Sequence, residues 1–246
     1  MSAVYKEEPK RLDFLTHLEE LRRRILIIIV FFVLIAITLF SKGEYFLSIL
    51  KRPIGTASEL IFISPTEAFT SYLKIIFLAS FIISFPVILF QLWAFMHPAF
   101  SGKRKNRIAV WLSSALGFFA VGILFSYFIA IPAALKFLLN FGSGIASPMI
   151  TLGRYTSFVA ALILVGGIVF EIPILIGLLT DIGILKADYL RKKRPQALIG
   201  IMIAAAIITP TQDILNMLMF AIPMVLLFEI GVILSKIIEN KKIHKT

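Results

Sequence analysis

The sequence contains no cysteine, and its 14 acidic residues are outnumbered by 25 basic ones. Without a thiol the chain can form no disulfide, thiolate nucleophile or cysteine-ligated metal site. None of its three histidines, His17, His97 and His244, has the spacing of a zinc motif such as H-E-x-x-H. A Gly-rich phosphate loop, a dinucleotide fingerprint and paired catalytic carboxylates are also missing from the sequence. We therefore expect no enzymatic activity, no cofactor and no metal.

Charged residues are scarce, and apolar residues are abundant. The two classes make up 16% and 59% of the 246 residues, and the mean hydropathy is +0.95. Soluble domains average about 25% charged residues, so the composition indicates a membrane protein. The basic residues lie in short clusters between apolar stretches, which is a topology signal and argues against a nucleic-acid partner. The N-terminal stretch has no apolar core, so we expect no cleavable signal peptide.

Six apolar stretches predict an all-α, polytopic membrane protein with one transmembrane domain. We expect residues 1–11 to be flexible and 12–24 to form an amphipathic helix along the cytoplasmic membrane surface. If both termini are cytoplasmic, 19 of the 25 basic residues are on that side, as the positive-inside rule requires. The expected spans are about 25–40, 73–96, 108–131, 157–179, 196–208 and 214–234, followed by a basic cytoplasmic tail over 235–246.

Two adjacent carboxylates precede the first span. Thr16 and Glu19 fit a capping box, which gives Glu19 a structural role at a helix start. Glu20 has two interpretations. It pairs with Arg24 one helical turn later, or it takes a guanidinium from a partner in a bidentate contact.

The stretch 157–179 holds a single carboxylate, Glu171, followed two residues later by Pro173. An ionisable group inside a span is costly and by default marks a functional site. The span contains no Lys or Arg to pair with it, and Glu171 lies about 12 Å from the cytoplasmic end. We expect the carboxyl to face a polar, water-accessible concavity. The alternative is a side chain that snorkels to the headgroups or pairs within the bundle.

The fifth stretch is short. Residues 196–208 reach only about 20 Å as a helix, against a hydrocarbon core of about 30 Å. We expect thinned lipid beside spans five and six, and a docking edge there for single-span partners.

Six segments carry a family resemblance, in order, from His17 to about Ser235. They are HLEELRRRI (17–25), SPTEAF (64–69), FPVILFQLWAFMHPAF (85–100), FEIPI (170–174), RKKRP (191–195) and ITPTQDILNMLMFAIPMVLLFEIGV (208–232). Together they resemble TatC, the signal-peptide receptor of the twin-arginine protein translocase. The resemblance implies a glove-shaped, six-span receptor without enzymatic activity in the cell inner membrane. It also implies single-span TatA- and TatB-type partners, self-association in a larger complex, folded cargo with twin-arginine signal peptides, and use of the proton-motive force.

The resemblance also assigns functional residues. Phe95 and Phe100 flank Pro98 at the expected cytoplasmic end of span two, where aromatics either form an interfacial belt or pack a docking peptide. By resemblance, signal-peptide binding falls on Glu20, Arg22 and Phe95, the intramembrane partner site on Glu171 and Asp213, and a functional outer-loop proline on Pro53. One departure is Arg104, which stands where several relatives carry a glutamate that helps read the arginine pair.

A rival interpretation is a proton-coupled small-solute transporter with Glu171 as the proton carrier. It predicts a closed solute pocket and paired discontinuous helices in two structural repeats. The sequence shows no convincing internal repeat.

Overall fold

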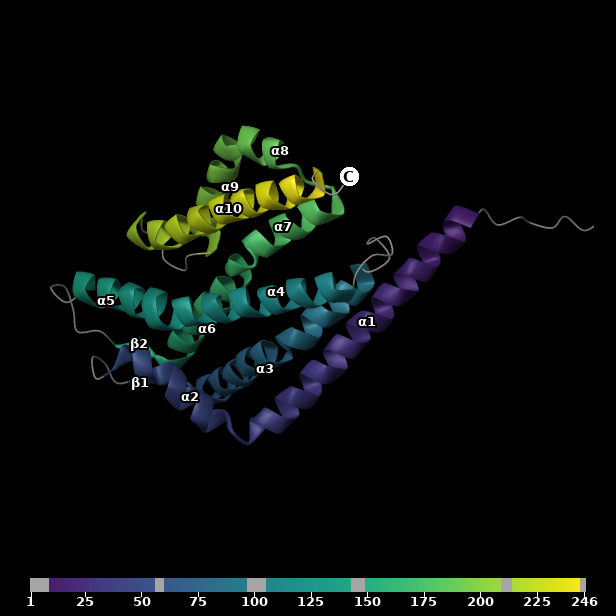
Figure 1. Cartoon of the computed structure of the whole chain (residues 1–246). Coiled ribbons are helices and arrows are strands. Elements are labelled where there is room, and N and C mark those ends of the chain that lie inside the picture. The colour runs from purple at the N-terminus through teal and green to yellow at the C-terminus, as the bar shows by residue number, and fades with distance from the viewer. Residues whose placement is uncertain (1–8, 56–59, 97–104, 143–148, 209–213, 244–246) are drawn as a thin grey trace, which may run out of the picture.

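The computed structural model describes residues 9–55, 60–96, 105–142, 149–208 and 214–243, which form a helical bundle (Figure 1). Two short strands, β1 (Leu60–Ile61) and β2 (Ile150–Thr151), pair in parallel with Leu60 opposite Ile150. The helices are α1 (Pro9–Phe40), α2 (Gly43–Lys51), the 3₁₀ turn η1 (Arg52–Ile54), α3 (Pro65–Met96), α4 (Lys105–Phe125), the π-helical turn η3 (Ser126–Ala130), α5 (Ile131–Gly142), α6 (Leu152–Phe170), α7 (Ile172–Ile182), α8 (Ala187–Lys192), α9 (Arg194–Ile208) and α10 (Ile214–Ile243).

Five segments of the described chain are long and apolar enough to cross a membrane: His17–Phe40, Pro65–Phe95, Ala109–Asn140, Leu152–Ile182 and Met217–Lys241. The remaining expected span, the fifth, corresponds to α9, which is apolar but shorter. The first turn of α1 and the last turn of α10 lie on the side of the bundle opposite α2 and β1 (Figure 1). This arrangement fits termini on one side of a membrane. The six-span count and the cytoplasmic orientation remain predictions.

The N-terminal segment differs from the sequence-based expectation. α1 is one continuous helix that begins at Pro9, so 9–11 are helical and 12–24 are not a separate surface helix. Proline is well suited to the first helical position, because its missing N–H would have no partner there. No glycine or proline interrupts 12–40, so nothing ends the helix before the apolar part. The capping-box prediction at Thr16 is wrong for the same reason, since this residue lies inside the helix.

Three other boundaries also moved. The expected loop over 41–71 contains α2 and η1, and α3 begins at Pro65. The third span continues through the π-helical turn into α5. The fourth begins at Leu152 and is broken at Glu171, which separates α6 from α7.

The core of the bundle is centred on α6. Its buried side chains include Tyr155, Val159 and Leu162, and the helix packs against α3 and α4. α4 and α6 approach closely at Gly122 and Gly166: a Cβ at either position would overlap the backbone or a side chain of the opposite helix. Small residues at such contacts let two membrane helices pack backbone against backbone.

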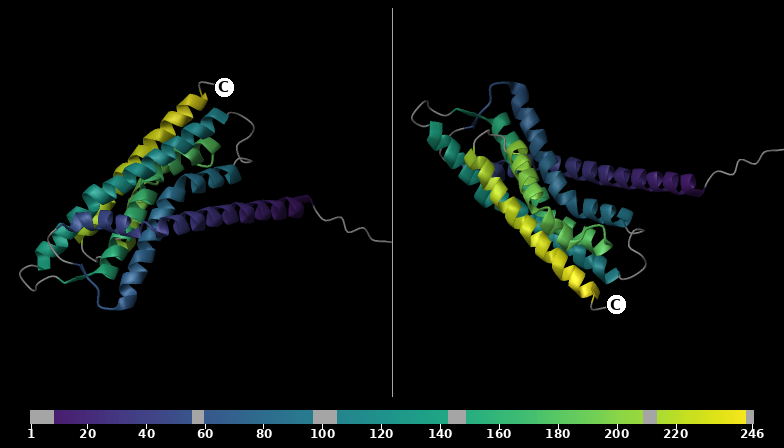
Figure 2. Two further views of the ribbon diagram at one scale, coloured as in Figure 1. Left: turned by 90° about the horizontal axis from the view of Figure 1, so that it is seen from below. Right: turned by 90° about the horizontal axis from the view of Figure 1, so that it is seen from above.

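α1 lies at the edge of the bundle (Figure 2). It packs against α3, and none of its apolar window is buried inside the described structure. Its C-terminal end is fixed by Tyr72 of α3. The Tyr72 hydroxyl donates to the Phe40 carbonyl and accepts a hydrogen bond from Gly43 N at 3.2 Å.

We predict that Gly166→Ala destabilises the bundle. Its new methyl would collide with the Ser126 hydroxyl and meet the Gly122 carbonyl, and overpacking of this kind costs about 1–3 kcal/mol. Thermal unfolding in detergent, followed by circular dichroism, checks this. Gly117→Ala is the matched control, because a Cβ there has nothing within 4 Å and Ala favours a helix over Gly by up to about 1 kcal/mol. An unchanged midpoint for Gly166→Ala would show that the helices separate at no cost.

Candidate functional site

A pocket of about 580 Å³ opens between α1 and α3, where the apolar part of α1 begins. The α1 side of the lining recurs at spacings of three and four residues, which places these side chains on one helix face. Several charged and polar groups therefore converge beside an otherwise apolar helix pair. The lining residues are Glu19, Glu20, Arg23, Arg24 and Ile27 from α1, with Phe90 and Gln91 from α3.

Glu20 is paired within the chain. Arg24 donates to Glu20 Oε1 from both Nε, at 3.0 Å, and Nη2. Arg24 Nη1 also donates to Gln91 Oε1 of α3 at 3.2 Å. The Arg24 side chain is 22% exposed and that of Glu20 is 34% exposed. The ion pair with Arg24 expected from the helical spacing is thus present. It does not exclude the second interpretation, because the carboxylate still reaches solvent.

His17 connects Glu20 to Phe95. The imidazole stacks on the Phe95 ring with centroids 4.3 Å apart, and its Nδ1 lies 3.9 Å from Glu20 Oε2. Phe95 belongs to the last turn of α3, so two of the predicted site residues are brought together from different helices. A carboxylate beside an aromatic surface suits a guanidinium, which pairs with the one and stacks on the other.

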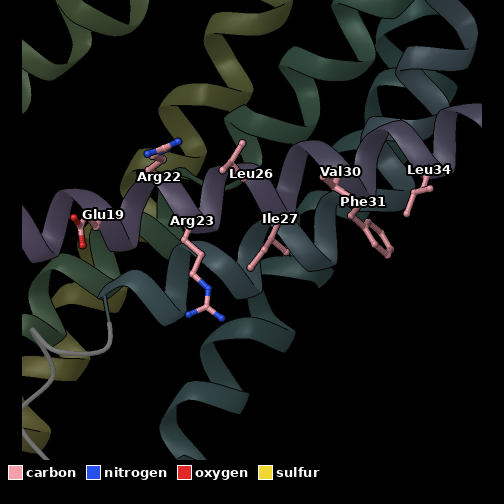
Figure 3. Close-up of a pocket in the computed structure, with 8 residues that line it drawn as sticks. All are labelled: Glu19, Arg22, Arg23, Leu26, Ile27, Val30, Phe31 and Leu34. Atoms are coloured by element: carbon pink, nitrogen blue, oxygen red, sulfur yellow. The ribbon is translucent and has the colours of Figure 1, made fainter.

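Arg22 lies on another face of α1. Figure 3 shows its side chain pointing to the opposite side of the helix from Arg23. It lines a groove formed by Glu19, Arg22, Arg23, Leu26, Ile27, Val30, Phe31 and Leu34, all from α1. Within the described chain, Arg22 and Glu20 therefore do not share a pocket.

The remaining predicted residues of the cytoplasmic and outer sites are not gathered at Glu20. Phe100, Asp213 and Arg104 lie outside the residues that the structure describes. Pro53 is half-buried in η1, which follows α2 at the far end of the bundle, and Gly55 ends that turn with a positive φ of 59°.

Glu171 occupies the junction between α6 and α7. The ladder of helical hydrogen bonds breaks there because Pro173 has no N–H to donate, and Glu171 N bonds the Ile168 carbonyl at 3.1 Å. The residue is only 8% exposed, and its side-chain Oε1 has no hydrogen-bond partner among the described residues. The expected water-accessible position is therefore wrong. α10 packs against α7 and approaches Pro173 at Gly231, which brings a third helix up to the junction.

A second polar pocket, of about 890 Å³, lies beside β2 at the end of the bundle opposite the start of α1. Glu67, in the first turn of α3, accepts hydrogen bonds from Ile63 N at 2.9 Å and Gly153 N at 2.7 Å. Lys74 donates to Ser157 Oγ at 2.8 Å. The Glu67–Gly153 contact joins the first turns of α3 and α6, and the Lys74–Ser157 contact joins the same two helices farther along.

Sequence reasoning missed Gln91 and Glu67 as organising residues. Gln91 is a lone amide within the apolar run FPVILFQLWAF, and such a residue inside a span is itself a signal of a polar partner. Glu67 stands in the first turn of a helix, where a carboxylate suits free N–H groups. Neither signal names Arg24 or Gly153 as the partner, because both come from distant parts of the chain.

A family model described as Sec-independent protein translocase protein (TatC) matches residues 16–223. Several proteins of that name are similar over most of this chain. The protein from Carboxydothermus hydrogenoformans is 35% identical and is aligned over 96% of this chain and 97% of its own length. That from Escherichia coli K12 is 37% identical, over 92% and 89% respectively.

The fold also matches an experimental structure. A crystal structure of the twin-arginine translocase receptor TatC superposes with a TM-score of 0.81 at 37% identity, covering 91% of this chain and 99% of that one. The all-α arrangement of apolar helices described above is therefore the arrangement of that receptor.

Proposed function

This chain belongs to the TatC family of Sec-independent protein translocase proteins, and from that membership we propose that it binds the twin-arginine signal peptides of folded proteins. The observation that carries the proposal is the Glu20 pocket. A partly exposed carboxylate already holds a guanidinium there, with the Phe95 ring stacked on the neighbouring His17. A signal-peptide arginine offers the same chemistry as Arg24. Binding would exploit charge-assisted hydrogen bonds at the cytoplasmic membrane surface.

Glu20 and Phe95 form the proposed contact for the arginine pair. Phe100, five residues after Phe95 in the sequence, is proposed to contact the signal peptide as well. Arg22, on a different face of α1, would contact the polar part of the peptide or the headgroups of anionic lipid. The rest of the signal peptide would lie along the apolar groove of α1. The protein would lie in the cytoplasmic membrane with both termini inside the cell. The proton-motive force would drive the transport of the folded cargo.

Single-span partner subunits of the TatA and TatB type are proposed to dock elsewhere, along α9 and α10. α9 has 15 residues and exposes Ile199, Ile203 and Ile207, one turn apart. A partner helix would cover this apolar row where the membrane is thinned by the short span. Asp213 would supply a polar contact to the partner, whereas the buried Glu171 would act on this docking edge indirectly, through α10. Copies of the chain would associate in a larger complex.

The rival interpretation, a solute transporter, has less support. It predicts two matching discontinuous helices. α6 and α7 are broken at Glu171, whereas α3 and α10 continue through Pro86 and Pro223. Family membership favours the translocase.

We predict that Glu20→Ala weakens binding of a twin-arginine peptide about tenfold or more, because a charge-assisted contact at a partly dry site is worth about 1.5–3 kcal/mol. Fluorescence anisotropy of a labelled signal peptide with the detergent-solubilised protein measures this. Glu19→Ala is the control: it removes the same charge from the same pocket, but Glu19 makes no ion pair with a described residue. Equal affinity of wild type and Glu20→Ala would sink the proposal.

Glu171 is tested by substitution series. Glu171→Gln keeps the size and hydrogen-bonding groups and should retain assembly and much of the transport, whereas Glu171→Ala and Glu171→Leu should disturb partner contacts without preventing insertion. Transport of a reporter with a twin-arginine signal, together with co-purification of the small subunits, distinguishes these. If Glu171→Gln is as inactive as Glu171→Ala, a titrating carboxyl is required, and the proton-carrier interpretation gains support.

Lengthening α9 tests the docking edge. About five leucines inserted after Ala206 would extend the helix by about 7.5 Å and relieve the mismatch with the bilayer. We expect normal membrane insertion but impaired transport. An insertion of the same length in the exposed α7–α8 connection, after Ile184, controls for added chain length. Normal transport by the α9 variant would rule out a role for the short span.

A further inference from the structure

One charged side chain in the Glu20 pocket is left unexplained by the proposed function: Arg24. Three consecutive arginines follow Leu21, and they are not equivalent. Arg22 and Arg23 are exposed, whereas Arg24 is largely covered and bonded on two sides, to Glu20 of α1 and to Gln91 of α3. A guanidinium therefore already occupies the carboxylate that a signal-peptide arginine would use.

We propose that Arg24 is a resident competitor for the Glu20 carboxylate, which a signal-peptide arginine must displace in order to bind. The inference rests on the proposed function, because it assumes that Glu20 receives the ligand. It adds a regulatory element at that site. In the free protein the carboxylate is held by the chain's own guanidinium, so only a ligand that offers a better contact exchanges with it.

The geometry of the carboxylate makes displacement necessary. Arg24 Nε and Nη2 both bond Oε1, while Oε2 has only His17 Nδ1 at 3.9 Å among the described residues. A bidentate arginine contact uses both oxygens of a carboxylate. A ligand arginine can make its first bond at Oε2, but the second requires Oε1 and hence the departure of Arg24.

Gln91 provides a place for the displaced side chain. Its Oε1 accepts from Arg24 Nη1 at 3.2 Å, from the α3 side of the pocket. Arg24 can therefore release Glu20 and keep one hydrogen bond. A lysine in the ligand makes a single point contact, so it can bond Oε2 and leave Arg24 in place, whereas a planar guanidinium must displace Arg24 to bond both oxygens. The competitor therefore lowers the affinity for arginine more than the affinity for lysine.

Arg23 is the natural comparison for Arg24. It lines the same pocket, carries the same charge and is one residue away, but makes no ion pair with Glu20. Removing either arginine lowers the repulsion felt by a cationic ligand. Only the removal of Arg24 also frees the carboxylate.

The experiment measures binding of a fluorescent Arg-Arg signal peptide, and of its Lys-Lys counterpart, to the full-length protein in detergent. Exposed ion pairs between residues one helical turn apart are weak, so we expect Arg24→Gln to tighten Arg-Arg binding about two- to fivefold beyond the effect of Arg23→Gln. It should tighten Lys-Lys binding less, because a lysine bonds Oε2 without displacing Arg24, so the preference for the Arg-Arg peptide over the Lys-Lys peptide widens. Weaker binding by Arg24→Gln, or the same change as Arg23→Gln, overturns the proposal and makes Arg24 a positioning residue for Glu20.

Two further variants keep the outcome interpretable. Arg24→Lys preserves the charge, and its affinity for the Arg-Arg peptide should lie between those of wild type and Arg24→Gln. Weaker binding than wild type would count against competition. In a Glu20→Ala background, Arg24→Gln and Arg23→Gln should change the peptide affinity equally, because the carboxylate for which Arg24 competes is absent. If Glu20→Ala alone binds the peptide as wild type does, the proposed function itself fails. If Glu20 is required for binding and Arg24→Gln gives no more affinity than Arg23→Gln, only the proposal that Arg24 competes for Glu20 fails.

Discussion

Helices that share a lipid environment gain little by burying apolar surface against each other, so their association depends on close packing and on polar contacts that water cannot replace. The bundle meets this constraint at its centre. Gly122 and Gly166 bring the backbones of α4 and α6 together, and the Thr180 hydroxyl donates to Ser235 Oγ at 2.8 Å to join α7 to α10. α6 and α7, which are separated only by the break at Glu171, therefore connect the rest of the bundle: α6 packs against α4, and α7 packs against α10.

α1 is attached by a different means. No residue of its apolar window is fully buried, and two of its contacts with α3 are polar: Tyr72 with Phe40 at its C-terminal end and Arg24 with Gln91 near its middle. The proposed recognition carboxylate thus lies on the least buried of the five span-length segments of the described chain. An exposed position suits a residue that must exchange one partner for another, because neither state requires the core to repack.

Hydropathy located the helices but not all of their limits, and the reason differs from place to place. A span must be apolar over a length set by the bilayer, so each long span was visible in the sequence. Pro9 starts α1 earlier than the apolar pattern does, since a helix continues through polar residues until something stops it. At the site, the spacing of Glu20 and Arg24 predicted their ion pair, because both lie on one helix. The contacts of Arg24 with Gln91 and of His17 with Phe95 join helices about 70 residues apart. No local pattern encodes such contacts. The burial of Glu171 was not predicted, because no local sequence pattern encodes how other helices pack around the break between α6 and α7.

α1 is long compared with the contact that fixes its C-terminal end, so a small tilt of the helix about that contact moves its N-terminal half by a large distance. Tyr72 grips the helix at Phe40, and Glu20 lies 20 residues away, which is about 30 Å along a helix axis at 1.5 Å per residue. A tilt of about 5° about that grip therefore carries the carboxylate about 2.6 Å sideways, nearly the length of a hydrogen bond. Near Glu20, the Arg24–Gln91 hydrogen bond and the His17–Phe95 stack both restrain such a swing. A small angular change of α1 at Phe40 is in this way geometrically amplified into the making or breaking of a contact at Glu20.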